Sequence, residues 1–208
     1  MKNYNDEYYI AFRPSGDNQI YIKPDLNTAK RQYHFKQLVY GEKPLFFLNG
    51  FKGEDKNRWP LTDLFVDSAG LLINKEVKLK MDNYDIDGMQ IYPSIYIDDN
   101  NVWHENYWYL GFYKELDCLD RDNSSIETFD FDDDDDDDDD ELLEVKKFSL
   151  DGRVLEKIAE NERLIFKIAN CSKSYLLFHQ KVVDFIVQRK LSGVRFIKVV
   201  DFFEGQQY

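Results

Sequence analysis

Short apolar runs separated by polar turn residues dominate the hydrophobic pattern of this chain. Runs of this kind that are rich in aromatic and β-branched residues are typical of strands. We predict strands over residues 8–12, 19–22, 44–48, 89–97, 103–112, 143–148, 164–168, 175–178 and 194–200. The first two flank a turn-forming stretch, Pro14 to Asn18, so they are expected to form a hairpin.

Helical patterns are confined to a few short segments. The strongest covers about residues 180–191, where Val182, Val183 and Ile186 lie on one apolar side. Gly193 follows it where a left-handed C-terminal cap is expected. Asn74 is placed to cap a second helix that runs to about Met81, because its side-chain oxygen can accept a free backbone N–H. A third short helix is expected over residues 28–38.

These elements predict an α+β fold that is rich in strands. We expect mixed or antiparallel sheets with a few packed helices, including one C-terminal helix that is followed by a final strand. The 208 residues are 43% hydrophobic, which is enough to build a core. The length predicts a single domain over residues 1–208, or two subdomains with N-terminal strands to about residue 60 and a main body over 61–208.

Charge is distributed unevenly along the chain. The formal net charge is −13, but nine consecutive aspartates at residues 132–140 account for nine of these charges, which leaves −4. Adjacent like charges repel each other, so residues 121–141 are expected to form an acidic, disordered loop. An acidic chain is a poor ligand for nucleic acid and a good one for a basic protein.

The sequence offers no sign of secretion or membrane insertion. The N-terminus lacks the apolar core of a signal peptide, and no apolar stretch is long enough for a spanning helix. Cys118 and Cys171 match no metal or redox spacing and are expected to be free thiols. We therefore expect a cytoplasmic protein without contact to a membrane.

No catalytic motif is present. The chain has no phosphate-binding glycine loop, nucleophile elbow or zinc-binding histidine pair, and His34, His104 and His179 stand singly. We expect no enzyme activity, cofactor or metal. A hydrolase built from dispersed carboxylates and a cation-binding protein acting through the aspartate run are the alternatives.

Two features are candidates for binding a protein partner. Exposed Trp and Tyr are favoured anchors in interfaces, although the same residues also form cores. The aspartate run has three interpretations: an inert solvated insert, an electrostatic attractant for a basic protein, or a cation site. The cation site is disfavoured because the run lacks the turn glycine of a calcium loop. The tentative partner-binding residues are Trp103, Tyr107, Tyr109, Asp132, Asp133, Asp134, Asp135, Asp136, Asp137, Asp138, Asp139 and Asp140.

Seven short stretches in a fixed order carry a resemblance to a known family. They are Leu61–Leu64, Ser68–Ile73, Met89–Pro93, Trp103 with Tyr107–Leu110, Leu116–Asp120 with Ser124 and Ser125, Leu164–Ile168, and Leu191–Phe196. Over about residues 40 to 200 the chain resembles immunity-protein family eleven of bacterial polymorphic-toxin systems and is similar to the related family forty-three.

The resemblance implies a cytoplasmic protein that binds and occludes a cognate toxin domain, encoded nearby, without enzyme activity or cofactor. The family offers no catalytic residues to transfer to this chain. The aspartate run falls where the family typically has a short variable connection. Edge strands in a strand-rich protein can pair with those of a second copy, so the sequence is also compatible with a homodimer.

Overall fold

The computed structural model describes residues 3–16, 19–50, 60–67, 70–127 and 143–206. Its strands are β1 (Tyr8–Phe12), β2 (Ile22–Pro24), β3 (Leu45–Asn49), β4 (Leu64–Val66), β5 (Gly70–Asn74), β6 (Met89–Ile97), β7 (Trp103–Phe112), β8 (Glu115–Leu116), β9 (Ser125–Glu127), β10 (Glu144–Lys147), β11 (Ile165–Ile168), β12 (Leu176–His179) and β13 (Arg195–Lys198). Its helices are α1 (Leu26–Ala29), α2 (Lys75–Met81), α3 (Gly152–Leu155) and α4 (Gln180–Gln188), with 3₁₀ turns η1 (Tyr4–Asp6), η2 (Glu160–Glu162) and η3 (Val199–Asp201).

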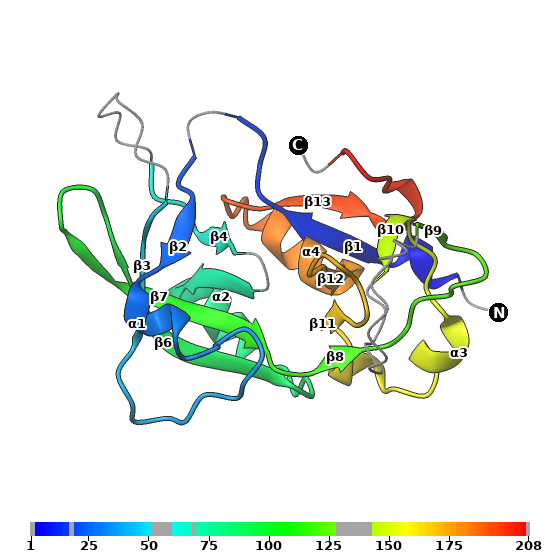
Figure 1. The fold of residues 1–208 in the computed structure, drawn as a ribbon, viewed down its shortest axis with the longest axis horizontal. Helices are drawn as coiled ribbons and strands as arrows, with labels where there is room; N and C mark the ends of the chain where they lie inside the picture. The colour runs from blue at the N-terminus through cyan, green and yellow to red at the C-terminus, as the bar shows by residue number, and fades with distance from the viewer. Residues whose placement is uncertain (1–2, 17–18, 51–59, 68–69, 128–142, 207–208) are drawn as a thin grey trace, which may run out of the picture.

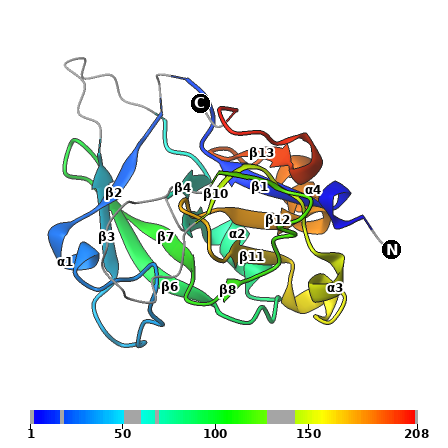
Figure 2. The same cartoon turned by 45° about the vertical axis from the view of Figure 1, so that its right-hand side comes forward.

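Two mixed sheets organise the molecule. The six-stranded sheet has the order β2-β3-β6-β7-β5-β4, and only β3 and β6 are parallel in it. The five-stranded sheet has the order β13-β1-β12-β11-β8, and only β11 and β8 are parallel in it. Strands β9 and β10 form a separate pair. The two large sheets lie at opposite sides of Figure 1, and Figure 2 shows the same separation from another direction. The predicted α+β fold is confirmed.

Three apolar cores hold these layers together. The first lies between the two large sheets and takes side chains from both of them and from α2 and α4. The second lies on the other face of the five-stranded sheet, under β10, α3 and η3. The third lies on the other face of the six-stranded sheet and is rich in tyrosine, including Tyr33, Tyr92, Tyr96, Tyr107 and Tyr109. Each large sheet is therefore covered by apolar contacts on both faces, as a buried mixed sheet requires.

Local sequence features predicted helices α2 and α4. Asn74 caps α2, since its side-chain oxygen accepts a hydrogen bond from the N–H of Val77 at 3.0 Å, as predicted. Helix α4 buries Val182, Val183 and Ile186 on one side and is followed by β13, also as predicted.

The end of α4 differs from the prediction. The helix ends with Lys190 in the left-handed conformation (φ 55°), and Leu191 N–H donates to the carbonyl of Ile186, which is the pattern of a Schellman cap. Gly193 is not the cap: a Cβ at this position would overlap the backbone carbonyl oxygen of Leu64. Gly193 therefore allows the connection from α4 to β13 to approach β4.

The N-terminal part differs from the prediction as well. Strand β1 does not form a hairpin with β2, because β1 pairs with β12 and β13 while β2 pairs with β3. The described strands from residues 1–60 are thus divided between the two large sheets. The helix expected over residues 28–38 is the shorter α1, which Asp25 caps.

The acidic, disordered loop expected over residues 121–141 is contradicted for residues 121–127. Residues 121–127 form a turn and then β9, which pairs with β10. The pairing is stabilised on one side by Ile126, which packs against the second core. Residues 128–142, with the aspartate run, lie outside the described residues.

Candidate partner-binding surface

Strand β7 carries a bulge that decides where its aromatic side chains point. Ser94 of β6 opposes Tyr107, but Tyr96, two residues later, opposes His104, so β7 has one extra residue between these pairs. An extra residue moves the following side chains to the opposite face of the sheet. Tyr107 therefore faces the tyrosine-rich third core, whereas Trp103 lies on the other face beside Phe46, with ring centroids 5.6 Å apart.

The structure separates the three aromatic residues that the sequence singled out. Tyr107 and Tyr109 are 4% and 0% exposed, whereas Trp103 is 54% exposed. The Tyr107 hydroxyl donates to the carbonyl of Thr62 at 2.7 Å, and burial raises the pKa of Tyr107 to about 12. Tyr107 and Tyr109 build the sheet and offer no surface to a partner in this structure. Trp103 does offer one.

Space for Tyr109 is made by two glycines on neighbouring positions. A Cβ at Gly70 of β5 or at Gly111 of β7 would overlap the Tyr109 ring. The Tyr109 hydroxyl lies 3.2 Å from Nδ1 of His34, and burial raises the pKa of Tyr109 well above its usual value. Gly70 and Tyr109 both belong to stretches that carry the family resemblance, so these stretches serve the scaffold.

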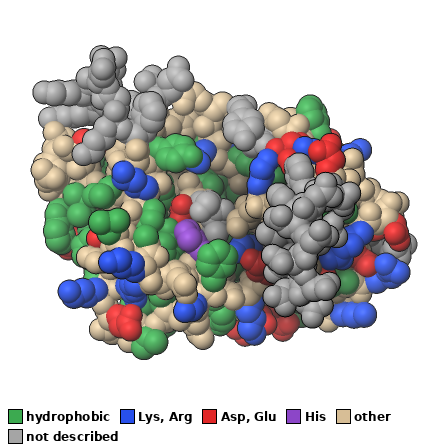
Figure 3. Space-filling view, viewed as in Figure 1, with side chains coloured by type: hydrophobic (Ala, Val, Ile, Leu, Met, Phe, Trp, Pro, Cys, Tyr) green, Lys and Arg blue, Asp and Glu red, His purple; other side chains and the backbone are tan. Residues whose placement is uncertain are grey.

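A second surface was not predicted. Residues 19–43, here called the 19–43 surface, include β2, α1 and the turns after α1. Twelve large apolar residues are exposed in the described part of the chain, and five of them lie here: Tyr21, Leu26, Phe35, Val39 and Tyr40. Figure 3 shows hydrophobic and basic side chains interleaved at its lower left, over the region of α1 and the following loop.

The backbone of the 19–43 surface is firmly attached to the six-stranded sheet. The N–H of Phe46 donates to the Thr28 hydroxyl at 2.8 Å, and the N–H of Leu38 donates to the Gln90 side chain at 2.8 Å. The Tyr92 hydroxyl donates to the carbonyl of Val39 at 2.9 Å. Exposure of the apolar side chains is therefore a property of an ordered segment.

The 19–43 surface contacts Asp67, which follows β4, and Lys167 of the five-stranded sheet. Tyr33 donates to Asp67 at 2.9 Å, and Nε2 of His34 lies 3.7 Å from the same carboxylate. Burial lowers the pKa of His34 and the positive charge of Lys167 lowers it further, against the opposing effect of Asp67. Lys167 of β11 is only 2% exposed, and its ammonium lies 2.5 Å from Glu115.

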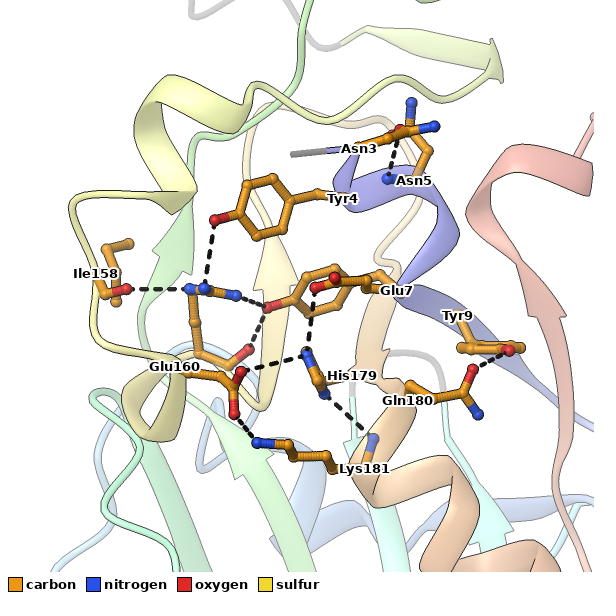
Figure 4. A network of polar contacts seen from close by, with 12 residues as sticks. Asn3, Tyr4, Asn5, Glu7, Tyr9, Ile158, Glu160, His179, Gln180 and Lys181 are labelled. Atoms are coloured by element: carbon orange, nitrogen blue, oxygen red, sulfur yellow. Dashed lines mark hydrogen bonds and ion pairs between the residues drawn. The ribbon is translucent and has the colours of Figure 1, made fainter. Parts of the chain in front are cut away.

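A polar network ties α4 to the N-terminal residues (Figure 4). Nδ1 of His179 accepts from the N–H of Lys181 at 3.2 Å and so caps α4, while Nε2 lies 3.6 Å from Glu7 and 4.0 Å from Glu160. Burial is the main cause that lowers the pKa of His179. The guanidinium of Arg163 donates to the Tyr8 hydroxyl at 2.7 Å and to the carbonyl of Ile158 at 3.0 Å.

This network joins α4, η2 and the N-terminal residues to one another. In the described residues, no three or more His, Cys, Asp and Glu side chains are placed to hold a metal ion. Cys118 and Cys171 are free thiols, and burial raises the pKa of Cys171 to about 12, which disfavours its reactive thiolate. None of the helices within the described ranges combines the length and apolarity needed to cross a membrane.

Ordered, exposed aromatic side chains on a rigid sheet are typical of proteins that bind other proteins. The chain belongs to the Immunity protein family (Imm11), whose sequence model matches residues 13–201. The suspected relationship is thereby confirmed and extended toward the N-terminus to include the 19–43 surface. No curated protein matches the chain significantly.

Two of the stretches that carry the resemblance meet in the structure. Asp63, from the stretch Leu61–Leu64, accepts hydrogen bonds from Ser192, which belongs to the C-terminal stretch. Sequence reasoning missed the 19–43 surface because exposure cannot be read from an irregular segment. The one available signal was its surplus of lysine and arginine in an acidic chain.

Proposed function

We propose that this protein neutralises a bacterial toxin by binding it and occluding its active site or a neighbouring surface, without catalysis of its own. The match of residues 13–201 to the Immunity protein family (Imm11) carries this proposal. The toxin is expected to be encoded next to the gene of this protein and to be met in the cytoplasm.

Two features would serve such binding in different ways. Trp103 offers a large, exposed apolar side chain that a partner can bury, which slows dissociation. The nine charges of Asp132 to Asp140 would attract a basic toxin over a longer distance and raise the association rate. In this proposal the run acts through charge, so it needs no fixed geometry.

The test is co-expression with the product of the adjacent gene. A stoichiometric complex that survives moderate salt on a sizing column, together with rescued growth of cells that make the toxin, is the expected result. A toxin of unrelated activity serves as the control and should be neither bound nor neutralised. The elution volume of the protein alone reports on a homodimer.

Absence of a complex with any neighbouring gene product, combined with continued killing on co-expression, would overturn the proposal. Rescue without a complex would show protection by another route and would contradict the binding mechanism.

A further inference from the structure

The 19–43 surface has the opposite charge to the chain as a whole. It contains Lys23, Lys30, Arg31, Lys36 and Lys43 against Asp25 and Glu42, which gives 5 − 2 = +3 in a chain of net charge −13. The two carboxylates are already used within the segment. Asp25 accepts the N–H of Thr28 at the start of α1, and Glu42 pairs with Arg31 at 2.9 Å.

The four lysines of the segment are available to a partner. Lys23, Lys30, Lys36 and Lys43 are exposed, and none forms an ion pair with any residue in the described ranges. Each can therefore form a new ion pair with a ligand without breaking an old one.

The aromatic side chains of the surface are fixed in advance. Tyr40 stacks on Tyr92 with ring centroids 5.7 Å apart, and its hydroxyl donates to the carbonyl of Ile91 at 3.0 Å. The Phe35 ring lies over the buried ammonium of Lys167, with Nζ 4.7 Å from the ring centroid.

Tyr21 lies against the guanidinium of Arg13, whose central carbon is 3.4 Å from the ring centroid. All three exposed rings of the surface are thus ordered by a contact within the protein. Side chains that are ordered before binding lose little conformational entropy when a partner covers them.

We propose that the 19–43 surface is a docking site for an acidic patch, with apolar residues within it, on the surface of the toxin domain. The inference rests on the toxin-binding function proposed above and deepens it by naming the surface and the chemistry of its partner. Exposed apolar side chains interleaved with lysines fit a patch that combines aspartate and glutamate with apolar side chains.

A protein patch fits these observations better than a polyanion. A nucleic acid or an anionic membrane presents negative charge over a wide area and would be repelled by the acidic remainder of the chain. A protein domain can present one acidic patch and be basic elsewhere. The aliphatic side chains Leu26 and Val39 also need an apolar counterpart, which stacked bases do not provide as well as a protein does.

Two double variants test the apolar and the charged parts separately. Phe35→Ala with Tyr40→Ala removes two exposed rings, and Lys30→Glu with Lys36→Glu reverses two charges. The matched controls are Leu79→Ala, exposed on α2, and Lys157→Glu, exposed after α3. Each protein is titrated calorimetrically with the toxin domain from the adjacent gene at low and moderate salt, and near-ultraviolet circular dichroism checks the fold.

We expect each double variant to weaken binding at least about tenfold, since ordered aromatic and charged contacts at an interface centre contribute most of the affinity. In the Lys30→Glu, Lys36→Glu variant, the affinity for the toxin should also depend less on salt concentration than in the unchanged protein. Both controls should bind as the unchanged protein does. If the aromatic double variant unfolds, the exposed aliphatic pair Leu26→Ser and Val39→Ser replaces it.

Wild-type affinity in both double variants, while the unchanged protein binds the toxin, would overturn this inference and leave the proposed function intact. Failure of the unchanged protein to bind the toxin would overturn both. Binding of single-stranded DNA or of phosphatidylserine vesicles that the lysine variant abolishes, with toxin affinity unchanged, would overturn the inference in favour of a polyanionic ligand.

Discussion

The carboxylate of Asp63 accepts two hydrogen bonds from Ser192, one from its backbone N–H and one from its hydroxyl, both at 2.8 Å. Beside this contact, the N–H of Leu64 donates to the carbonyl of Ser192 at 3.0 Å. The start of β4, in the six-stranded sheet, is thereby attached to the connection between α4 and β13. The two sheets meet here through backbone, so the geometry tolerates little change.

Gly193 is the position where this junction is most sensitive. Gly193→Ala should destabilise the protein by about 3 kcal/mol, since a Cβ would collide with the Leu64 carbonyl and φ is +97°. Gly41→Ala is a matched control: φ is +95°, but no atom lies within 4 Å of the added Cβ, so a cost of about 1 kcal/mol is expected. Urea unfolding measures both. Equal losses would contradict the collision.

Arg163 is predicted to stabilise the attachment of the N-terminus. Arg163→Lys should destabilise the protein by about 2–3 kcal/mol, because lysine lacks the separate Nε–H that donates to the carbonyl of Ile158 while another nitrogen donates to Tyr8. The side chain is 6% exposed, so water cannot replace the lost donors. Arg189→Lys, at an exposed position, should change stability by less than about 0.5 kcal/mol. Thermal unfolding of the two variants measures these changes in stability. A small loss of stability for Arg163→Lys would contradict the role of Arg163 in attaching the N-terminus.

Stability should fall on acidification in part through His179 and His34. Burial holds the pKa of each below 6.5, so the unfolded chain takes up protons first. Their contribution is therefore complete above pH 6.5 and is lost as the pH falls through the lowered values. His179→Asn keeps a cap for α4 but cannot titrate. Its free energy of unfolding should depend less on pH between 7.5 and 5, and an unchanged dependence would refute the assignment.

Trp103 should contribute to binding and not to folding. Trp103→Ala is expected to leave the melting temperature nearly unchanged and to weaken toxin binding by about tenfold or more. Tyr107→Phe and Tyr109→Phe should show the reverse pattern, since these hydroxyls are bonded inside the third core. Surface-immobilised toxin measures the affinities. Unchanged binding by Trp103→Ala would place the interface elsewhere.

The aspartate run should act on the rate of association. Replacement of Asp132 to Asp140 by asparagine removes nine charges and keeps the chain length. With a basic toxin we expect a slower association that depends less on salt, while the dissociation rate changes little. Stopped-flow mixing at several salt concentrations measures this. An unchanged association rate would favour the alternative of an inert insert.

Local features of the fold could be predicted well from the sequence, and long-range ones could not. The cap at Asn74 depends on residues within one helical turn, and the prediction was confirmed. The partner of β1 could not be predicted in this way. The turn-forming residues after β1 indicated a hairpin, but pairing with β12 and β13 depends on residues that are distant in sequence.

The same reasoning applies to the candidate site. The sequence left open whether the aromatic side chains of β7 form the core or an interface, and the bulge sets which of them share a face. Two adjacent exposed residues, Glu105 and Asn106, occupy the bulge, and nothing in their chemistry marks it in advance. Hydrogen bonds between the backbone and the side chains of Tyr92 and Gln90 hold the 19–43 surface in place, which is likewise a tertiary effect.

The position of β1 in the five-stranded sheet also affects when the protein becomes active during synthesis. Both neighbours of β1, β12 and β13, come from the last part of the described chain, and Tyr8 pairs with His179. Strand β1 is synthesised before β12 and β13 and must therefore wait for them before its sheet can close, and such distant pairing is slow to form. Under the proposed function, a cell that makes the toxin and this protein together would need translation of this protein to run ahead by at least the time this closure takes.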